Sequence, residues 1–210
     1  MDVFLSIALG IALAAATGFR VFVPLLAAGL AARAGWIPLT ESFSWLATTP
    51  ALVMLGTAAL LETFAYYIPG VDHVLDVLAS PVAIVAGVIA SASVMTDVNP
   101  ALMWPIAIIA GGGIAGATKG STAVVRAKTG VATAGFGNPI VSTVETTGSI
   151  LLSILALLLP LVALAAILAL LIWAARKVGR HIFGPRRKPG ELTTKSTKHT
   201  HDSDDTRSSL

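Results

Sequence analysis

Long apolar runs separated by short polar breaks dominate the pattern of this sequence. The runs cover residues 3–19, 21–32, 51–61, 82–95, 101–118 and 149–175. The last run has no charged side chain and exceeds the roughly 20 residues that a helix needs to cross a bilayer core. The pattern therefore predicts an all-α fold: a polytopic helical membrane protein embedded in a lipid bilayer.

Five transmembrane helices account for these runs, with bounds near 3–33, 50–67, 73–96, 102–127 and 149–176. Five spans place the N-terminus outside and the C-terminus in the cytoplasm. Six spans are the alternative, in which a segment at 139–147 completes a crossing and both termini lie inside. Six spans also put Lys119, Arg126 and Lys128 inside, which the positive-inside rule favours. Because 139–147 is short for a crossing, we expect five spans.

Two of these spans are expected to be irregular. As one helix, segment 3–33 would be about 46 Å long against a core of about 30 Å, so it must tilt, overhang the membrane or break. Thr17–Gly18 and Pro24 are the predicted break points, and Lys119–Gly120 is the predicted break in 102–127. Small residues recur at every fourth position at Gly112, Gly116 and Gly120. That spacing predicts a close approach of two helices.

Residues 131–148 are too polar for an ordinary span and too apolar for an ordinary loop. Gly135, Gly137 and Pro139 argue against a continuous helix. We expect a short helix over 139–147, with Asn138 as its N-cap, that is re-entrant or buried against other helices. Irregular backbone at membrane depth is tolerated only inside protein or beside water, so this segment is a candidate functional region.

The chain also contains a degenerate internal repeat. GIALAAAT at 10–17 resembles GGIAGAT at 112–118, and each half carries a glutamate ahead of a proline-bearing apolar helix, Glu62 and Glu145. The repeat predicts one helical transmembrane domain, 1–177, in two halves of about 1–97 and 98–177. Two related halves with a site between them are the usual construction of transporters.

Composition adds the membrane orientation. Only 12% of the residues are charged, against about 25% in a typical soluble domain. Nine of the 14 basic residues follow Ala175, which predicts a cytoplasmic C-terminus and an anionic-lipid contact at Arg176–Lys188. The polar remainder, 178–210, is predicted to be a basic, disordered cytoplasmic tail. The absence of cysteine excludes disulfides, thiolate metal sites and cysteine nucleophiles.

The stretch ETFAYYIPGVDHVLDVLASP at 62–81 concentrates polar residues in an apolar chain. Asp72 suits the cap of the helix after the Pro69–Gly70 turn, and Asp76 suits its first turn. Alternatively, Asp72, His73 and Asp76 share one helical face and could bind a divalent cation or pass a proton. No established metal-ligand spacing is present, so no metal site or other cofactor is predicted.

Glu62 lies within a span, where capping of its own helix explains nothing and an ionisable side chain usually has a partner or a function. Glu145 is its counterpart in the repeat, and Arg20 and Lys119 are the counterpart cations. We hypothesise that these four residues converge between the halves as an intramembrane polar cluster. Further candidates are Asp72, His73, Asp76, Asn138 and Ser142. The alternative is an ion-paired scaffold that locks the helices together.

Three motifs in order resemble one family. GFRVFVPLLAAGLAAR (18–33), ETFAYYIPGVDHVLDVLASP (62–81) and GNPIVSTVE (137–145) resemble the uncharacterised bacterial membrane proteins called domain of unknown function 4126. The resemblance covers about residues 1–176 and implies an architecture without an activity. Two positions depart from it: Tyr66 stands where the family pattern implies an acid, and Thr146 stands where a second acid often follows Glu145.

Two functions follow from these features. One is a small permease or channel-like protein for an ion, proton or small polar solute, which as so short a chain would form a homo-oligomer. The other is a non-transporting, lipid-associated or partner-binding scaffold subunit. We expect no enzyme, because Ser142, Thr143 and Glu145 have no histidine partner and no nucleophile elbow. A multi-pass protein of the bacterial inner membrane, with no nucleic acid partner, is the expected setting.

Overall fold

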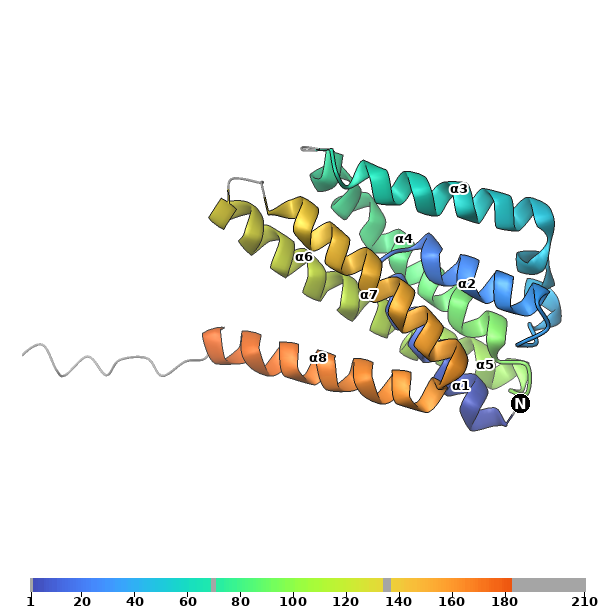
Figure 1. Cartoon of the computed structure of the whole chain (residues 1–210). Coiled ribbons are helices and arrows are strands. Elements are labelled where there is room, and N and C mark those ends of the chain that lie inside the picture. The colour runs from blue at the N-terminus through green and yellow to red at the C-terminus, as the bar shows by residue number, and fades with distance from the viewer. Residues whose placement is uncertain (1, 69–70, 134–136, 183–210) are drawn as a thin grey trace, which may run out of the picture. The chain divides into compact units, whose positions relative to one another are not determined.

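The computed structural model describes residues 2–68, 71–133 and 137–182, and the side chains of 71–73 and 178–182 fall outside this description. Every regular element of the described residues is a helix, which confirms the all-α class. The elements (Figure 1) are α1 (Val3–Thr17), α2 (Phe22–Arg33), the 3-10 helix η1 (Glu41–Ala47), α3 (Thr49–Ala65), α4 (Val71–Val94), α5 (Pro100–Ile106), the π-helical segment η2 (Ala107–Gly112), α6 (Gly113–Thr133), α7 (Asn138–Leu158) and α8 (Pro160–Ile182). Among the described residues, those up to Trp173 belong to one compact unit and those from Ala174 to a second.

α1 runs antiparallel to α4. Gly10 of α1 lies against Ser91 of α4, and seven residues later Thr17 donates a hydrogen bond to the carbonyl of Ala83, 3.3 Å away. α1 ends at Thr17, and the next residue, Gly18, packs against the backbone of α6. A Cβ atom at Gly18 would stand 2.6 Å from the carbonyl oxygen of Ala115.

α2 returns along α3 in the opposite direction. The backbone N–H of Phe22 is bonded to Glu62 near the end of α3, and the guanidinium of Arg33 is bonded to Thr49 at its start. Both outer ends of the α1–α2 pair therefore lie on one side of the bundle, and its turn lies within the bundle (Figure 1). We call this pair the re-entrant hairpin and residues 18–21 its tip.

The re-entrant hairpin corrects the expectation of a single span over 3–33. The break falls at Thr17–Gly18 as predicted, whereas Pro24 lies in the first turn of α2. Proline is tolerated there because the first N–H groups of a helix have no partner within it.

Three other predictions from the sequence place helix breaks or ends at the wrong residues. α6 passes through Lys119–Gly120 without a break, and the irregular backbone lies upstream in η2. The segment at 139–147 is not a separate short helix, because α7 continues to Leu158, with Gly137 and not Asn138 as N-cap. The predicted span 149–176 is instead interrupted at Leu159, where φ is −139° and ψ is 73° before Pro160. A residue before proline is displaced from the helical region, which explains this position.

Close packing of small residues joins α4 to η2 and to the start of α6. A Cβ atom at Gly111 would stand 2.6 Å from the Cβ of Ser91, and one at Gly87 would stand 2.5 Å from the Cβ of Ala115. Gly112 and Gly116, from the predicted four-residue spacing, also face α4, but Gly120 faces open space. Small residues thus bring α1, α4 and α6 together around the tip of the re-entrant hairpin.

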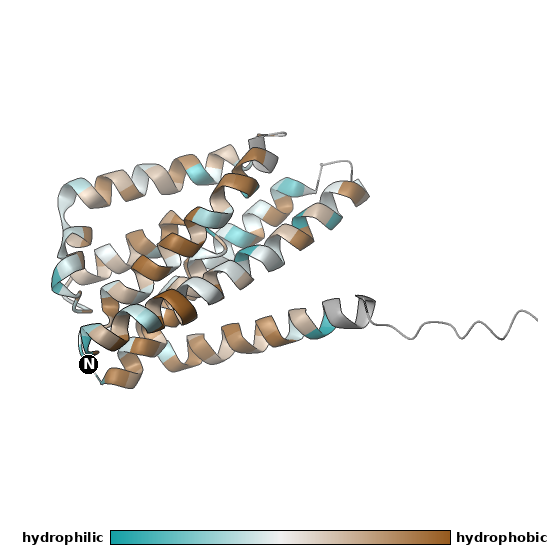
Figure 2. Ribbon diagram, turned by 180° about the vertical axis from the view of Figure 1, so that it is seen from behind, coloured by the Kyte–Doolittle hydropathy of each residue, from teal (hydrophilic) through white to brown (hydrophobic). Residues whose placement is uncertain are grey.

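By length and composition, four of the described helical segments can cross a membrane, and the bent pair of η1 and α3 gives a fifth. The crossing segments are Val74–Val94, Pro100–Thr133, Asn138–Leu158 and Pro160–Lys177, together with η1–α3. Large apolar side chains are exposed along these helices, as expected for lipid-facing surfaces. Figure 2 shows hydrophilic residues of α6 and α7 concentrated toward the ends that the 134–136 connection joins.

Candidate functional site

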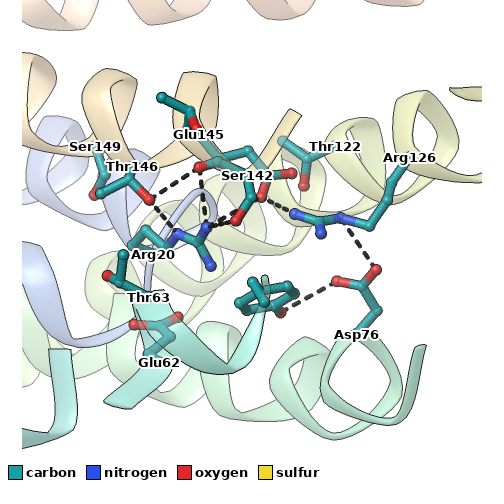
Figure 3. Close-up of polar contacts among 12 residues, drawn as sticks. Arg20, Glu62, Thr63, Asp76, Thr122, Arg126, Ser142, Glu145, Thr146 and Ser149 are labelled. Atoms are coloured by element: carbon teal, nitrogen blue, oxygen red, sulfur yellow. Dashed lines mark hydrogen bonds and ion pairs between the residues drawn. The ribbon is translucent and has the colours of Figure 1, made fainter. Parts of the chain in front are cut away.

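A buried network of ionisable side chains lies beside the tip of the re-entrant hairpin (Figure 3). We call the charged cluster the five residues Arg20, Asp76, Lys119, Arg126 and Glu145. Four of these side chains are at most 5% exposed, and Asp76 is 19% exposed. They come from the hairpin tip, α4, α6 and α7, so the cluster joins segments that are distant in the sequence.

Arg20 connects the hairpin tip to α7. Its Nε donates to Thr146 Oγ1 at 2.9 Å, and its Nη2 donates to the Ser142 carbonyl at 3.0 Å and to the Ser142 hydroxyl. The same Nη2 lies 4.0 Å from Glu145 Oε2. Arg20 lies between the end of α1 and the start of α2. The backbone of the tip can therefore direct its side chain into the bundle, where it is fully buried.

Glu145 and Asp76 flank Arg126. Arg126 Nη2 is paired with the Oε2 of Glu145, and its Nε lies 3.2 Å from Asp76 Oδ2. One oxygen of Glu145 therefore faces two guanidinium groups, and Arg126 bridges α4 and α7. Charge-assisted contacts of this kind are stronger than neutral hydrogen bonds.

Lys119 and Tyr66 complete the network. Lys119 Nζ lies 3.1 Å from Asp76 Oδ1 and 3.0 Å from the Tyr66 hydroxyl, which itself donates to Asp76 at 3.1 Å. The ring of Tyr66 is 4.3 Å from Arg20 Cζ, 4.5 Å from Arg126 Cζ and 5.3 Å from Lys119 Nζ. A neutral aromatic ring thus lies against all three cations and attracts them through its quadrupole.

Glu62 of α3 lies at the edge of the network, where it interacts electrostatically with Arg20 and Lys119 and also binds the start of α2. Its two carboxylate oxygens accept hydrogen bonds from the backbone N–H groups of Val21 (2.9 Å) and Phe22 (3.2 Å). These N–H groups are at the start of α2, where an anion is favoured. Glu62 therefore caps α2 from another helix and fixes the tip next to Arg20.

Several buried polar atoms of this region have no hydrogen-bond partner among the described residues. They are Arg20 Nη1, Arg126 Nη1, Glu145 Oε1 and Thr118 Oγ1, with Ser91 Oγ further along α4. Buried donors and acceptors are rarely left unmade, because each costs about 1–3 kcal/mol and more when charged. The network is therefore incomplete at the guanidinium groups.

Of the four residues that the sequence proposed as a polar cluster, the structure joins Arg20, Lys119 and Glu145 in one network of hydrogen bonds and ion pairs. The fourth, Glu62 of α3, is bonded to the backbone of the hairpin tip and interacts electrostatically with Arg20 and Lys119. Among the secondary candidates, Asp76 and Ser142 join the network. Asn138 is buried near Gly130 at the start of α7, and the side chains of Asp72 and His73 lie outside the described residues.

Three contributors were not proposed as site residues from the sequence. Arg126 lies seven residues after Lys119, which is the same face of α6, and that spacing was the available signal. Tyr66 and Thr146 are the two departures from the family pattern, and both contact Arg20.

No group of three or more histidine, aspartate or glutamate side chains with metal-binding geometry occurs within the described parts of the chain. The cluster is richer in cations than in carboxylates, which does not suit a metal ion.

Comparison with known proteins supplies a family. The family described as Domain of unknown function (DUF4126) matches residues 7–180, which include every residue of the charged cluster. Neither the curated proteins nor the solved structures give a match.

Proposed function

The chain belongs to this family of unknown function, and we propose from its geometry that it is a small permease or channel-like membrane protein. The charged cluster is the place where an ion, a proton or a small polar solute is bound on its way across the membrane. The observation that carries the proposal is the re-entrant hairpin, whose tip delivers Arg20 into the bundle interior beside incompletely paired arginines.

Interrupted helices support a transport site. Helix ends within the bilayer leave backbone groups that must be satisfied by protein, water or solute, and transporters form their sites from such ends. Here the start of α2 is satisfied by Glu62, and the carboxyl end of α1 is contacted by Ser149, which donates to the Ala16 carbonyl at 3.1 Å. Both contacts hold the tip in place while leaving the arginine side chains directed into the bundle.

The hairpin also supports an orientation. If the re-entrant hairpin does not cross the membrane, the chain crosses it five times, with α3, α4, α5–α6, α7 and α8. An odd number of crossings puts the N-terminus on one side of the membrane and the C-terminus on the other. The first side then carries Glu41 and Asp97 together with Arg33, whereas the second carries Lys128 and the basic tail. By the positive-inside rule we propose that the second side is cytoplasmic and that the protein lies in the bacterial inner membrane. This arrangement puts Lys128 on the same side as the basic tail with five crossings, and Arg33 lies on the opposite side at the outer end of the hairpin.

A second candidate function, a non-transporting scaffold, is favoured by one observation. Each member of the charged cluster has at least one partner, so the cluster also fastens α4, α6, α7 and the tip to one another. Breaking a buried ion pair by removing one partner costs about 3–5 kcal/mol, whether or not a solute is bound. Stability alone therefore does not distinguish the two functions.

Flux in proteoliposomes distinguishes them. Purified wild-type protein is compared with Glu145→Gln and with Arg33→Gln, a control at an exposed arginine of the hairpin's outer end. Protons, potassium and chloride are followed separately against protein-free vesicles. We expect flux of one species by wild type and the control, and altered flux by Glu145→Gln. Absence of flux for all three species, with folded protein in the vesicles, would favour the scaffold.

A further inference from the structure

We propose that residues 34–48, together with α5, form an interfacial patch that binds the lipid headgroups of one leaflet, with η1 lying close to the membrane plane. Three exposed tryptophans, Trp36, Trp45 and Trp104, define this patch. The inference needs the membrane class of the protein and holds whether or not the charged cluster transports a solute.

Three of the four tryptophans of the chain gather at one end of the bundle. Trp36 follows the end of α2, Trp45 belongs to η1 and Trp104 to α5, and their exposed fractions are 71%, 48% and 45%. The ring centroid of Trp104 is 6.2 Å from that of Phe43, which places α5 beside η1. An indole has an apolar body and one polar N–H group, so exposed tryptophans collect at the boundary between lipid chains and headgroups.

The interfacial patch is level with the end of a spanning helix. The N–H of Thr40 donates to the Ser93 carbonyl at 2.8 Å, and the Thr40 hydroxyl donates to the Ala92 carbonyl at 3.3 Å. α4 and its crossing segment both end at Val94. In Figure 1 the connection from α2 to α3 and the helix α5 lie at this same end of the bundle. The patch is therefore at the depth where a helix leaves the apolar core.

The geometry of η1 fits an interfacial helix better than the first part of a span. η1 is bent by 67° from α3, so it lies near the membrane plane when α3 crosses along the membrane normal. α3 by itself has 17 residues, enough to cross most of a core of about 30 Å. Phe43 and Leu46 of η1 are buried in the bundle, whereas Glu41 and Trp45 are exposed. The headgroup layer solvates both an exposed carboxylate and an exposed indole.

The interfacial patch also sets the depth of the charged cluster. From Val94 back to Asp76, α4 is about 27 Å long at 1.5 Å per residue. The apolar core is about 30 Å thick. The Asp76 side of the cluster is therefore close to the opposite leaflet and away from the membrane midplane.

Depth-dependent fluorescence quenching tests the patch in full-length protein reconstituted in phosphatidylcholine vesicles. Three proteins with a single tryptophan are compared, the other tryptophans being replaced by phenylalanine: one keeps Trp36, one keeps Trp45, and the control carries Val85→Trp. Val85 is an exposed residue within α4, away from both of its ends. We expect Trp36 and Trp45 to be quenched about twofold more by a nitroxide on the headgroup than by one at the end of the acyl chain, because the two labels lie about 15 Å apart in depth. The control should show the reverse order.

The other results of this experiment would overturn the proposal. Stronger quenching of Trp45 by the chain-end nitroxide would place η1 in the apolar core as part of a span. Quenching of Trp36 and Trp45 by a water-soluble quencher alone would place the patch in water. Protection from all three quenchers would show that protein covers the patch, for example a second copy of the chain.

A second measurement keeps the proposal testable if the combined tryptophan replacements prevent folding. The chain has no cysteine, so Trp45→Cys and Val85→Cys each accept one nitroxide in an otherwise native sequence. We expect the label at position 45 to collide with both oxygen and a water-soluble nickel chelate, and the label at position 85 to collide with oxygen alone. A label at position 45 that meets oxygen alone, or the chelate alone, would refute the headgroup position.

Discussion

Glu62 offers the sharpest test of how the hairpin tip is held. Replacing it with glutamine keeps the shape of the side chain but removes its charge and one of its two acceptor oxygens. The amide oxygen can still accept from Val21, whereas the amide nitrogen would face the N–H of Phe22, another donor. One backbone N–H at the start of α2 is then left without its partner.

The magnitude follows from these two bonds, at 2.9 Å and 3.2 Å. A hydrogen bond to a charged group contributes about 1.5–3 kcal/mol, and a carboxylate at a helix N-terminus adds about 0.3–1 kcal/mol. Losing one bond and the charge of the other should lower the free energy of unfolding by about 2–4 kcal/mol. At about 2–4 °C per kcal/mol for a chain of this size, the melting temperature should fall by roughly 5–15 °C.

Tryptophan fluorescence of the purified protein in detergent follows the unfolding. Glu41→Gln is the matched control, because Glu41 is an exposed glutamate in η1. The cap would be refuted if the melting temperatures of Glu62→Gln and of this control differed by only about a degree, because the expected difference is several times larger. It would also return Glu62 to the candidates for an intramembrane ionisable site.

Two further predictions concern packing and topology. Gly18→Ala should destabilise the protein by about 1–3 kcal/mol through overpacking against α6, whereas Gly113→Ala, which meets open space, should be neutral or stabilising in the same unfolding assay. Equal effects would contradict the close tip packing. The cysteine-free chain permits single-cysteine labelling with an impermeant maleimide, and in spheroplasts Ser42→Cys should react whereas Val131→Cys should react only after lysis. Labelling of both from outside would refute the proposed orientation.

The site shows how far residue pattern reaches into tertiary structure. Arg20, Lys119 and Glu145 stood out in the sequence because ionisable groups are costly in apolar segments, and the structure places all three in one network. The sequence did not show which of these charged side chains pair with one another. Arg126 meets Asp76 and Glu145 only because α4, α6 and α7 converge, and no local spacing specifies that convergence.

The sequence by itself determined the helical membrane class, because twenty or so consecutive apolar residues have few alternatives to a spanning helix. It also determined that segment 3–33 could not be one straight crossing, because the length exceeds the bilayer core. Only the tertiary structure decided that the chain turns back at Gly18–Val21. A chain that turns back and a chain that continues across the membrane have the same apolar residues, so the hydrophobic pattern does not distinguish them. The turn depends on tertiary contacts, in which Glu62 caps α2 and Gly18 packs against α6.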